Sequence, residues 1–217
     1  MMKNQTDIEI LYQDSEIVVT NKPGGLLSVP GRGPEKQDCV TGRLRRLFPN
    51  MIDQPAVHRL DMYTSGLMVF AITAETHRNL SGQFEKREVV KKYIAVVEGI
   101  ICESGGEIHL PFRLDPDNRP LQIYDPTSGK MGSTQWRKIA AAENTTRIEF
   151  TPLTGRTHQL RVHAAHPRPT GLGAPIVGDS LYGFGKEGDQ MMLHATFLQF
   201  THPSTKSVIN FSSTPPF

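Results

Sequence analysis

The chain contains the stretch His58-Arg-Leu-Asp-Met-Tyr-Thr-Ser-Gly-Leu-Met-Val-Phe-Ala-Ile72, in which a polar segment leads directly into an apolar one. The apolar part, Gly66 to Ile72, is short and is followed by Thr73, a residue that can cap a helix. Short apolar runs between turn residues are typical of buried strands. The stretch therefore predicts a strand over 66–72 with acidic, basic and hydroxyl side chains at its entrance.

Outward from this stretch, the pattern predicts more strands than helices. Strands are expected over 8–12, 16–20, 89–98, 191–200 and 206–211, with a further series between 106 and 152. Helices are expected from a cap at Asp38 to about Phe48, after a cap at Thr73, and from a cap at Thr157 to about His166. Most connections are too short for the crossovers of parallel pairs, so we predict an α+β fold with a mixed, largely antiparallel sheet and flanking helices.

Length and composition indicate a globular protein. The chain has 217 residues, of which 37% are hydrophobic and 21% charged, which fits one domain or two closely packed subdomains. No apolar run approaches the ~20 residues of a membrane-spanning helix. Residues 1–5 lack the apolar core of a signal peptide. We therefore expect a cytoplasmic protein without a membrane partner, in which Cys39 and Cys102 are free thiols.

Charge is nearly balanced overall but unevenly placed. Lys and Arg number 24 against 22 Asp and Glu, which gives a net charge of +2. Residues 30–95 carry 11 basic and 7 acidic side chains. That local excess is compatible with a basic surface for phosphates, and equally with ordinary solvated helix faces.

The polar segment His58–Gly66 is the first candidate for chemistry. Asp61 stands at the entrance of the predicted strand, where loops often carry catalytic groups. A carboxylate there could act as a nucleophile, a general base or a metal ligand. The alternative is a structural turn in which Asp61 caps backbone amides and pairs with Arg59.

The segment Gly155–His163 is the second candidate. Arg156 and Arg161 lie on either side of a predicted helix start, so Arg161 could hold a carboxylate or a phosphate in a bidentate pair. His158 and His163 are five residues apart, which is not the spacing of a helical metal pair, and we expect no metal site.

The predicted strand around Lys91–Val97 is the third candidate. Tyr93 lies on one face of it and Lys92 on the other. Tyr93 could present its ring to a base or its hydroxyl to a proton, or it could be an ordinary aromatic in a sheet. Glycine-rich phosphate motifs are absent, which disfavours chemistry that depends on ATP or NAD, and we expect no cofactor.

Taken together, the motifs resemble the RluA-type family of RNA pseudouridine synthases. The resemblance spans residues 8 to 211 and rests on five segments in the family's order, at 21–27, 58–66, 92–95, 152–163 and 175–183. It implies a single catalytic domain over 1–217 with the pseudouridine synthase fold and no S4-like RNA-binding domain. It also implies that the partner is RNA, either 23S rRNA or the anticodon stem-loop of tRNA, or both.

The resemblance also implies roles for particular residues. Asp61 matches the catalytic aspartate, Arg161 the arginine that pairs with it, and Tyr93 the tyrosine that stacks on the target base. Arg59 matches an arginine that fills the space left by the flipped nucleotide. Further candidates for RNA or substrate contact are His58, Thr64, Lys92, Arg156, His158, Gln159, Leu67 and Ile176, although core packing is the more common fate of the last two.

Two points stay open from the sequence. The stretch 166–174 is longer than the usual family link and adds Arg168 and two prolines. A non-catalytic RNA-binding module on the same scaffold is the alternative function, which Asp61, Tyr93 and Arg161 together disfavour because binding a polyanion requires no carboxylate. A third function, a small-molecule hydrolase with Asp61 as nucleophile, is disfavoured because the sequence shows no oxyanion-hole signature and no paired general acid. We expect a monomer.

Overall fold

The computed structural model describes residues 8–217, and the chain forms two compact units. One unit runs up to Lys91 and resumes over His194–Pro216, whereas the other comprises Lys92–Leu193 with Phe217. The chain passes from one unit to the other inside one strand, β4, and returns at the start of another, β9. Residues 1–5, considered above for a signal peptide, lie outside the described residues.

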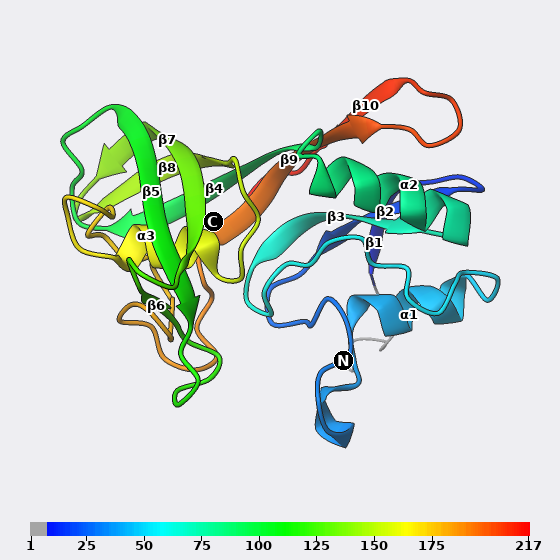
Figure 1. Ribbon diagram of the computed structural model, residues 1–217, viewed down its shortest axis with the longest axis horizontal. Helices are drawn as coiled ribbons and strands as arrows, with labels where there is room; N and C mark the ends of the chain where they lie inside the picture. The colour runs from blue at the N-terminus through cyan, green and yellow to red at the C-terminus, as the bar shows by residue number, and fades with distance from the viewer. Residues whose placement is uncertain (1–7) are drawn as a thin grey trace. The chain divides into compact units, whose positions relative to one another are not determined.

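The first unit is a sheet with two helices (Figure 1). Its strands follow the order β1-β2-β3-β9, and β10 pairs with β9. Their bounds are β1 Glu9–Gln13, β2 Ile17–Lys22, β3 Ser65–Ala71, β9 Leu193–Thr201 and β10 Val208–Ser212. All neighbours are antiparallel except β3 and β9, which confirms the predicted mixed, largely antiparallel character.

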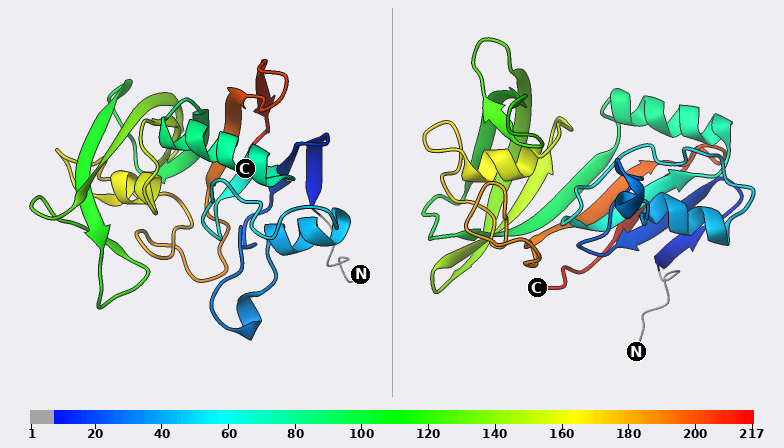
Figure 2. Two further views of the ribbon diagram at one scale, coloured as in Figure 1. Left: turned by 45° about the vertical axis from the view of Figure 1, so that its right-hand side comes forward. Right: turned by 90° about the horizontal axis from the view of Figure 1, so that it is seen from below.

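Helix α2 (Ala74–Glu85) covers one face of this sheet, and α1 (Val40–Leu47) lies toward the other (Figures 1 and 2). A short 3-10 helix spans Pro34–Lys36. The core under α2 comprises Ile17, Val19, Leu67, Val69, Ala71, Leu80, Val89, Leu198 and Phe200. Alternate residues of β2 and β3 enter this core, as expected when successive strand side chains point to opposite faces.

Two helix starts differ from the predictions, and one agrees. Thr73 caps α2, since its Oγ1 accepts from the Thr76 amide at 3.2 Å. The cap of α1 is Cys39 rather than Asp38, because the Asp38 carboxylate instead pairs with Arg43 at 2.7 Å. The predicted cap at Thr157 was also wrong: α3 (Gln159–Ala165) begins after His158, whose φ of 57° turns the chain into the helix.

The second unit is an antiparallel sheet in the order β4-β8-β7-β5-β6, with α3 against β7. Its strands are β4 Val90–Glu98, β5 Gly105–Leu114, β6 Gln122–Tyr124, β7 Lys130–Ala142 and β8 Thr145–Pro152. The strands curve around α3 (Figures 1 and 2). A long loop leads from α3 to β9 and carries the motif 175–183.

Three statements apply to the described residues as a whole. Cys39 is buried and Cys102 exposed, and both are free thiols. Between residues 8 and 217, no helix is long and apolar enough to cross a membrane. Within the same range, no three His, Cys, Asp or Glu side chains are grouped so that they could hold a metal ion.

Candidate active site

Asp61 lies in a tight turn that leads into β3. Its carbonyl oxygen accepts from the Thr64 amide at 3.1 Å, and Thr64 itself is buried. The Asp61 residue is only partly buried, so the turn is anchored on the protein side while the acidic residue reaches the surface. Arg59, two residues earlier, is exposed.

A buried lysine holds this turn. Lys22, at the end of β2, is fully buried, and its Nζ donates to the carbonyl oxygens of Pro23, Leu26 and Met62 at 2.9, 2.7 and 2.9 Å. Burial lowers the pKa of Lys22 to about 7, although the negative charge of Asp61 acts in the opposite direction. Lys22 thus ties the loop after β2 to the Asp61 turn, 40 residues further along the chain.

A glycine and a histidine fix the strand behind the turn. Gly66 has a φ of 113°, and a Cβ there would overlap the Ala195 backbone, because β3 and β9 approach closely at this point. Next to it, Ser65 Oγ lies 2.8 Å from His194 Nδ1, and His194 Nε2 lies 3.0 Å from Ser213 Oγ. Burial lowers the pKa of His194 to about 4 and keeps the ring neutral.

Two other predicted residues of this unit pack inside it. His58 stacks on Phe84 at 4.6 Å, and its Nε2 accepts from the Val69 amide at 3.1 Å. Burial, and then the charge of Lys91, lower the pKa of His58 to about 3. Leu67 belongs to the core under α2, which is the packing that is usual for such a strand residue.

In the second unit, Arg161 forms a buried pair with Asp179. Its Nε and Nη2 donate to the two carboxylate oxygens at 2.8 and 2.7 Å, and both side chains are almost inaccessible to water. Burial alone would raise the pKa of Asp179, but the Arg161 hydrogen bonds and the amides of Leu181 and Tyr182 hold it below its ordinary value. The predicted pairing of Arg161 with Asp61 stays a prediction.

The loop before α3 is held by Gln159. Its Oε1 accepts from Thr154 Oγ1 and from the Arg156 amide, and its Nε2 donates to Ser133 O and Thr134 Oγ1, all within 3.0 Å. These four bonds use the whole capacity of the amide. We therefore assign Gln159 to positioning the loop rather than to RNA contact, while Arg156 on the same loop is exposed.

His158 and Tyr182 form a second fixed contact near Arg161. The Tyr182 hydroxyl accepts from the Gln122 amide at 2.8 Å and lies 2.8 Å from His158 Nδ1. The Arg161 guanidinium lies 5.2 Å from the centre of the Tyr182 ring.

The remaining predicted residues lie in β4 and the following loops. Tyr93 is partly buried and opposite Phe150 of β8, on the face that α3 covers, whereas Lys92 on the other face lies 3.6 Å from Glu149. Ile176 is buried and forms a bridge with Val97. Ile176 therefore packs inside the unit, which is the outcome that the sequence favoured over a contact with RNA.

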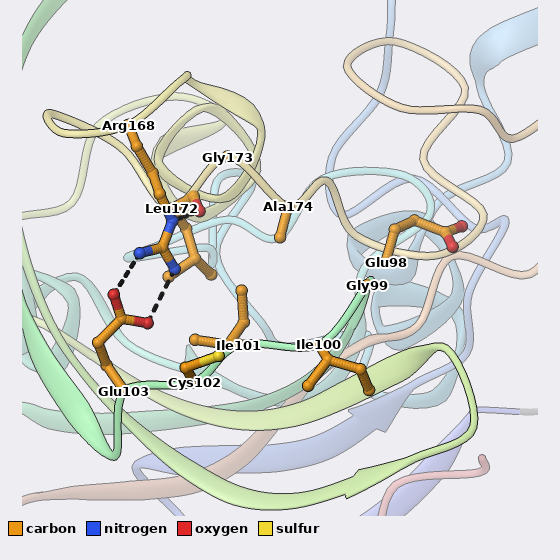
Figure 3. Close-up of a pocket in the computed structure, with 10 residues that line it drawn as sticks. All are labelled: Glu98, Gly99, Ile100, Ile101, Cys102, Glu103, Arg168, Leu172, Gly173 and Ala174. Atoms are coloured by element: carbon orange, nitrogen blue, oxygen red, sulfur yellow. Dashed lines mark hydrogen bonds and ion pairs between the residues drawn. The ribbon is translucent and has the colours of Figure 1, made fainter.

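Within the long stretch 166–174, Arg168 and residues 172–174 line a cavity of about 260 Å³ together with residues 98–103 (Figure 3). Arg168 pairs with Glu103 through Nη1 and Nη2, the two terminal guanidinium nitrogens, and its Nε donates to the Leu172 carbonyl oxygen at 3.1 Å. The added arginine is thus anchored at this cavity, whose lining includes none of the predicted site residues.

Sequence reasoning assigned no role to two residues that organise these elements. Lys22 and Asp179 both lie in motifs that carried the resemblance, 21–27 and 175–183. The available signal was their residue type, since a charged side chain beside a predicted core strand or loop requires a partner. Their partners were not readable, because Met62 and Arg161 are distant in sequence.

A family model described as RNA pseudouridylate synthase matches residues 16–166. The chain is also 42% identical to the dual-specificity RNA pseudouridine synthase RluA of Yersinia pestis, over 96% of this chain and 99% of that protein. The chain belongs to the RNA pseudouridylate synthase family. Its counterpart in Haemophilus influenzae is 41% identical over 97% of this chain and 94% of that protein.

Solved structures agree with this family. The human RNA pseudouridylate synthase domain containing 1 protein has a TM-score of 0.78 and 27% identity, over all of this chain and 87% of that one. The human domain containing 4 protein has a TM-score of 0.73 and 26% identity, over 96% and 88%. The protein is therefore an RluA-type RNA pseudouridine synthase with the expected fold, it acts on RNA, and nothing supports the non-catalytic alternative.

Proposed function

We propose that this synthase isomerises uridines in 23S rRNA and in the anticodon stem-loop of tRNA, with Asp61 as the catalytic carboxylate. Relatives that match nearly the whole chain are named dual-specificity enzymes, which favours two kinds of RNA target over one. The observation that carries the assignment is the Asp61 turn. Lys22 anchors this turn through a hydrogen bond to the Met62 carbonyl oxygen, while Asp61 itself stays partly accessible to solvent.

The reaction breaks the N1–C1′ bond of uridine, rotates the base and joins C5 to C1′. The hydrogen on C5 leaves as a proton and another proton is taken up at N1, so no atom is gained and no oxidant is needed. Asp61 can serve in two ways. It can attack C1′ and hold the sugar as an ester, or it can take a proton from C2′ to form a glycal and later return it.

Other residues are proposed to prepare this step. Tyr93 stacks on the target base and assists proton removal at C5, and Arg161 orients the catalytic carboxylate. Arg59, which is exposed, replaces the flipped nucleotide in the RNA stack and offsets part of the cost of flipping, a few kcal/mol. His158, which is held by the Tyr182 hydroxyl, contacts the substrate, and exposed Arg156 contacts phosphate.

Tritium release from RNA labelled at uridine C5 tests the proposal directly. Separate tRNA and rRNA fractions from cells that lack this gene serve as substrates. Wild-type protein should release tritium from both fractions, and Asp61→Asn should release none while binding RNA with nearly unchanged affinity. Asp53→Asn is the matched control, because Asp53 is a highly exposed aspartate eight residues earlier.

Either of two outcomes would contradict the proposal. Near-normal release by Asp61→Asn would remove Asp61 from the chemistry, and release from one fraction alone would restrict the substrate to that RNA. We also propose that the synthase works as a monomer in the cytoplasm. Sedimentation at micromolar concentration should then give a mass close to the 24.2 kDa of the chain.

A further inference from the structure

Phe184 is the most exposed large apolar side chain between residues 8 and 217. Its exposed fraction is 81%, and it stands between Gly183 and Gly185 in the loop from α3 to β9 (Figure 1, orange). Leu181 on the same loop is also exposed. A single exposed apolar side chain is common at a protein surface, so a role for this ring depends on the order of its backbone and on the residues to which its loop is joined.

The backbone around Phe184 is fixed from both sides. The amides of Gly183 and Gly185 both donate to the carbonyl oxygen of Asp179, at 3.1 and 3.2 Å. Gly185 also packs so closely on Gly178 that a Cβ on it would overlap the Gly178 backbone. The exposure of the ring therefore follows from a built turn, and a ligand that stacks on it need not order the backbone first.

The same turn belongs to the Arg161 site. Asp179 receives the two glycine amides on its carbonyl oxygen and holds Arg161 with its carboxylate. Tyr182, two residues before Phe184, bonds to His158. A ligand that approaches His158 and Arg161 would therefore meet the loop that presents the Phe184 ring.

We propose that Phe184 is a stacking platform for an unpaired base of the RNA substrate, an inference that rests on the proposed function. Bases in RNA loops can be splayed out and stacked on aromatic rings. The loop offers a π surface rather than positive charge, because Lys186 is accompanied by Glu187 and Asp189. A second copy of the chain is disfavoured as occupant, since one ring on one loop is far smaller than a stable interface.

Affinity measurements with Phe184 variants provide the first test. The probe is the synthetic anticodon stem-loop of a tRNA. Phe184→Ala should weaken binding roughly 5- to 100-fold, and Phe184→Trp should retain it. Phe184→Leu should resemble Phe184→Ala, because it keeps the apolar volume but lacks the ring face. The loss should be the same at ~50 and ~200 mM salt, since stacking releases no counterions. The control is Val208→Ala in β10, which removes another highly exposed apolar side chain.

Abasic substitutions in the RNA locate the base. At one position, removal of the base should weaken binding by wild-type protein but not by Phe184→Ala, because the partner of the ring is already lost. Unchanged affinity of Phe184→Ala, or equal losses for both proteins at every abasic position, would overturn the inference. A Phe184→Ala variant that changes only the sedimenting mass would identify a second copy as the occupant instead.

The outcomes separate this inference from the proposed function. Binding is measured without turnover, so it reports on Phe184 even when no isomerisation is seen. If wild-type protein releases tritium and Phe184→Ala binds RNA normally, the proposed function stands and the stacking platform is wrong. If Phe184→Ala loses affinity but wild-type protein releases no tritium, the platform stands and the proposed function is wrong.

Discussion

The buried pair of Arg161 and Asp179 allows a quantitative prediction. The change is Asp179→Asn, which keeps the shape of the side chain but removes its charge and turns one acceptor oxygen into an amide donor. That donor faces the guanidinium, which already donates at 2.8 and 2.7 Å, so the buried Arg161 loses the negative charge of the carboxylate that accepts both of these hydrogen bonds. Breaking a buried pair in this way costs about 3–5 kcal/mol of the free energy of unfolding.

Urea unfolding at pH 7.5 measures this cost. The control is Asp53→Asn, because Asp53 pairs with Arg45 at the same distance of 2.7 Å but both side chains are largely exposed. That surface variant should lose at most about 0.5 kcal/mol. A loss below about 1 kcal/mol for Asp179→Asn would refute the reasoning, since it would mean that water or another group compensates the buried guanidinium.

A double variant separates stability from activity. Replacing both partners by apolar residues, as in Arg161→Met with Asp179→Leu, removes both buried charges and should recover most of the lost stability. If Arg161 orients the catalytic carboxylate, this double variant should be stable and yet release no tritium. Recovered activity would exclude the proposed role of Arg161.

Three further predictions concern the first unit and the buried histidines. Gly66→Ala should lower the free energy of unfolding by about 3 kcal/mol, measured in urea, because its Cβ would overlap Ala195 and its φ is 113°. Lys22→Met should lower it by about 2–4 kcal/mol and reduce the melting temperature, because three carbonyl oxygens lose their donor; an unchanged melting temperature would contradict that role. Burial lowers the pKa of His163 and of His194 to about 4, so their contribution to stability is complete above pH 6.5 and is lost as the pH falls toward 4. Each of these histidines should cost about 2 kcal/mol at pH 5 in a urea titration, as should His58 with its pKa of about 3, so His194→Gln should remove about a third of that pH dependence.

Local pattern alone determined much of this protein. The apolar run that became β3, the cap at Thr73 and the strand β4 are set by side chains within a few residues of one another, so periodicity and capping chemistry predict them. The helix starts at Cys39 and His158 were missed by one residue each. In the first case Asp38 had a stronger partner in Arg43, and in the second a left-handed residue replaced a side-chain cap.

Only the tertiary structure decided which charged groups are partners. The motifs identified Asp61, Arg161 and the family from sequence, but Lys22 reaches Met62 across 40 residues and Arg161 reaches Asp179 across 18. Gln159 likewise became a positioning residue because β7 brings Ser133 and Thr134 to its amide. Such partners depend on how distant segments pack, and a buried donor or acceptor accepts whichever partner that packing supplies. Chemistry can therefore be predicted from residue types in a motif, whereas the contacts that hold the motif in place follow from the fold.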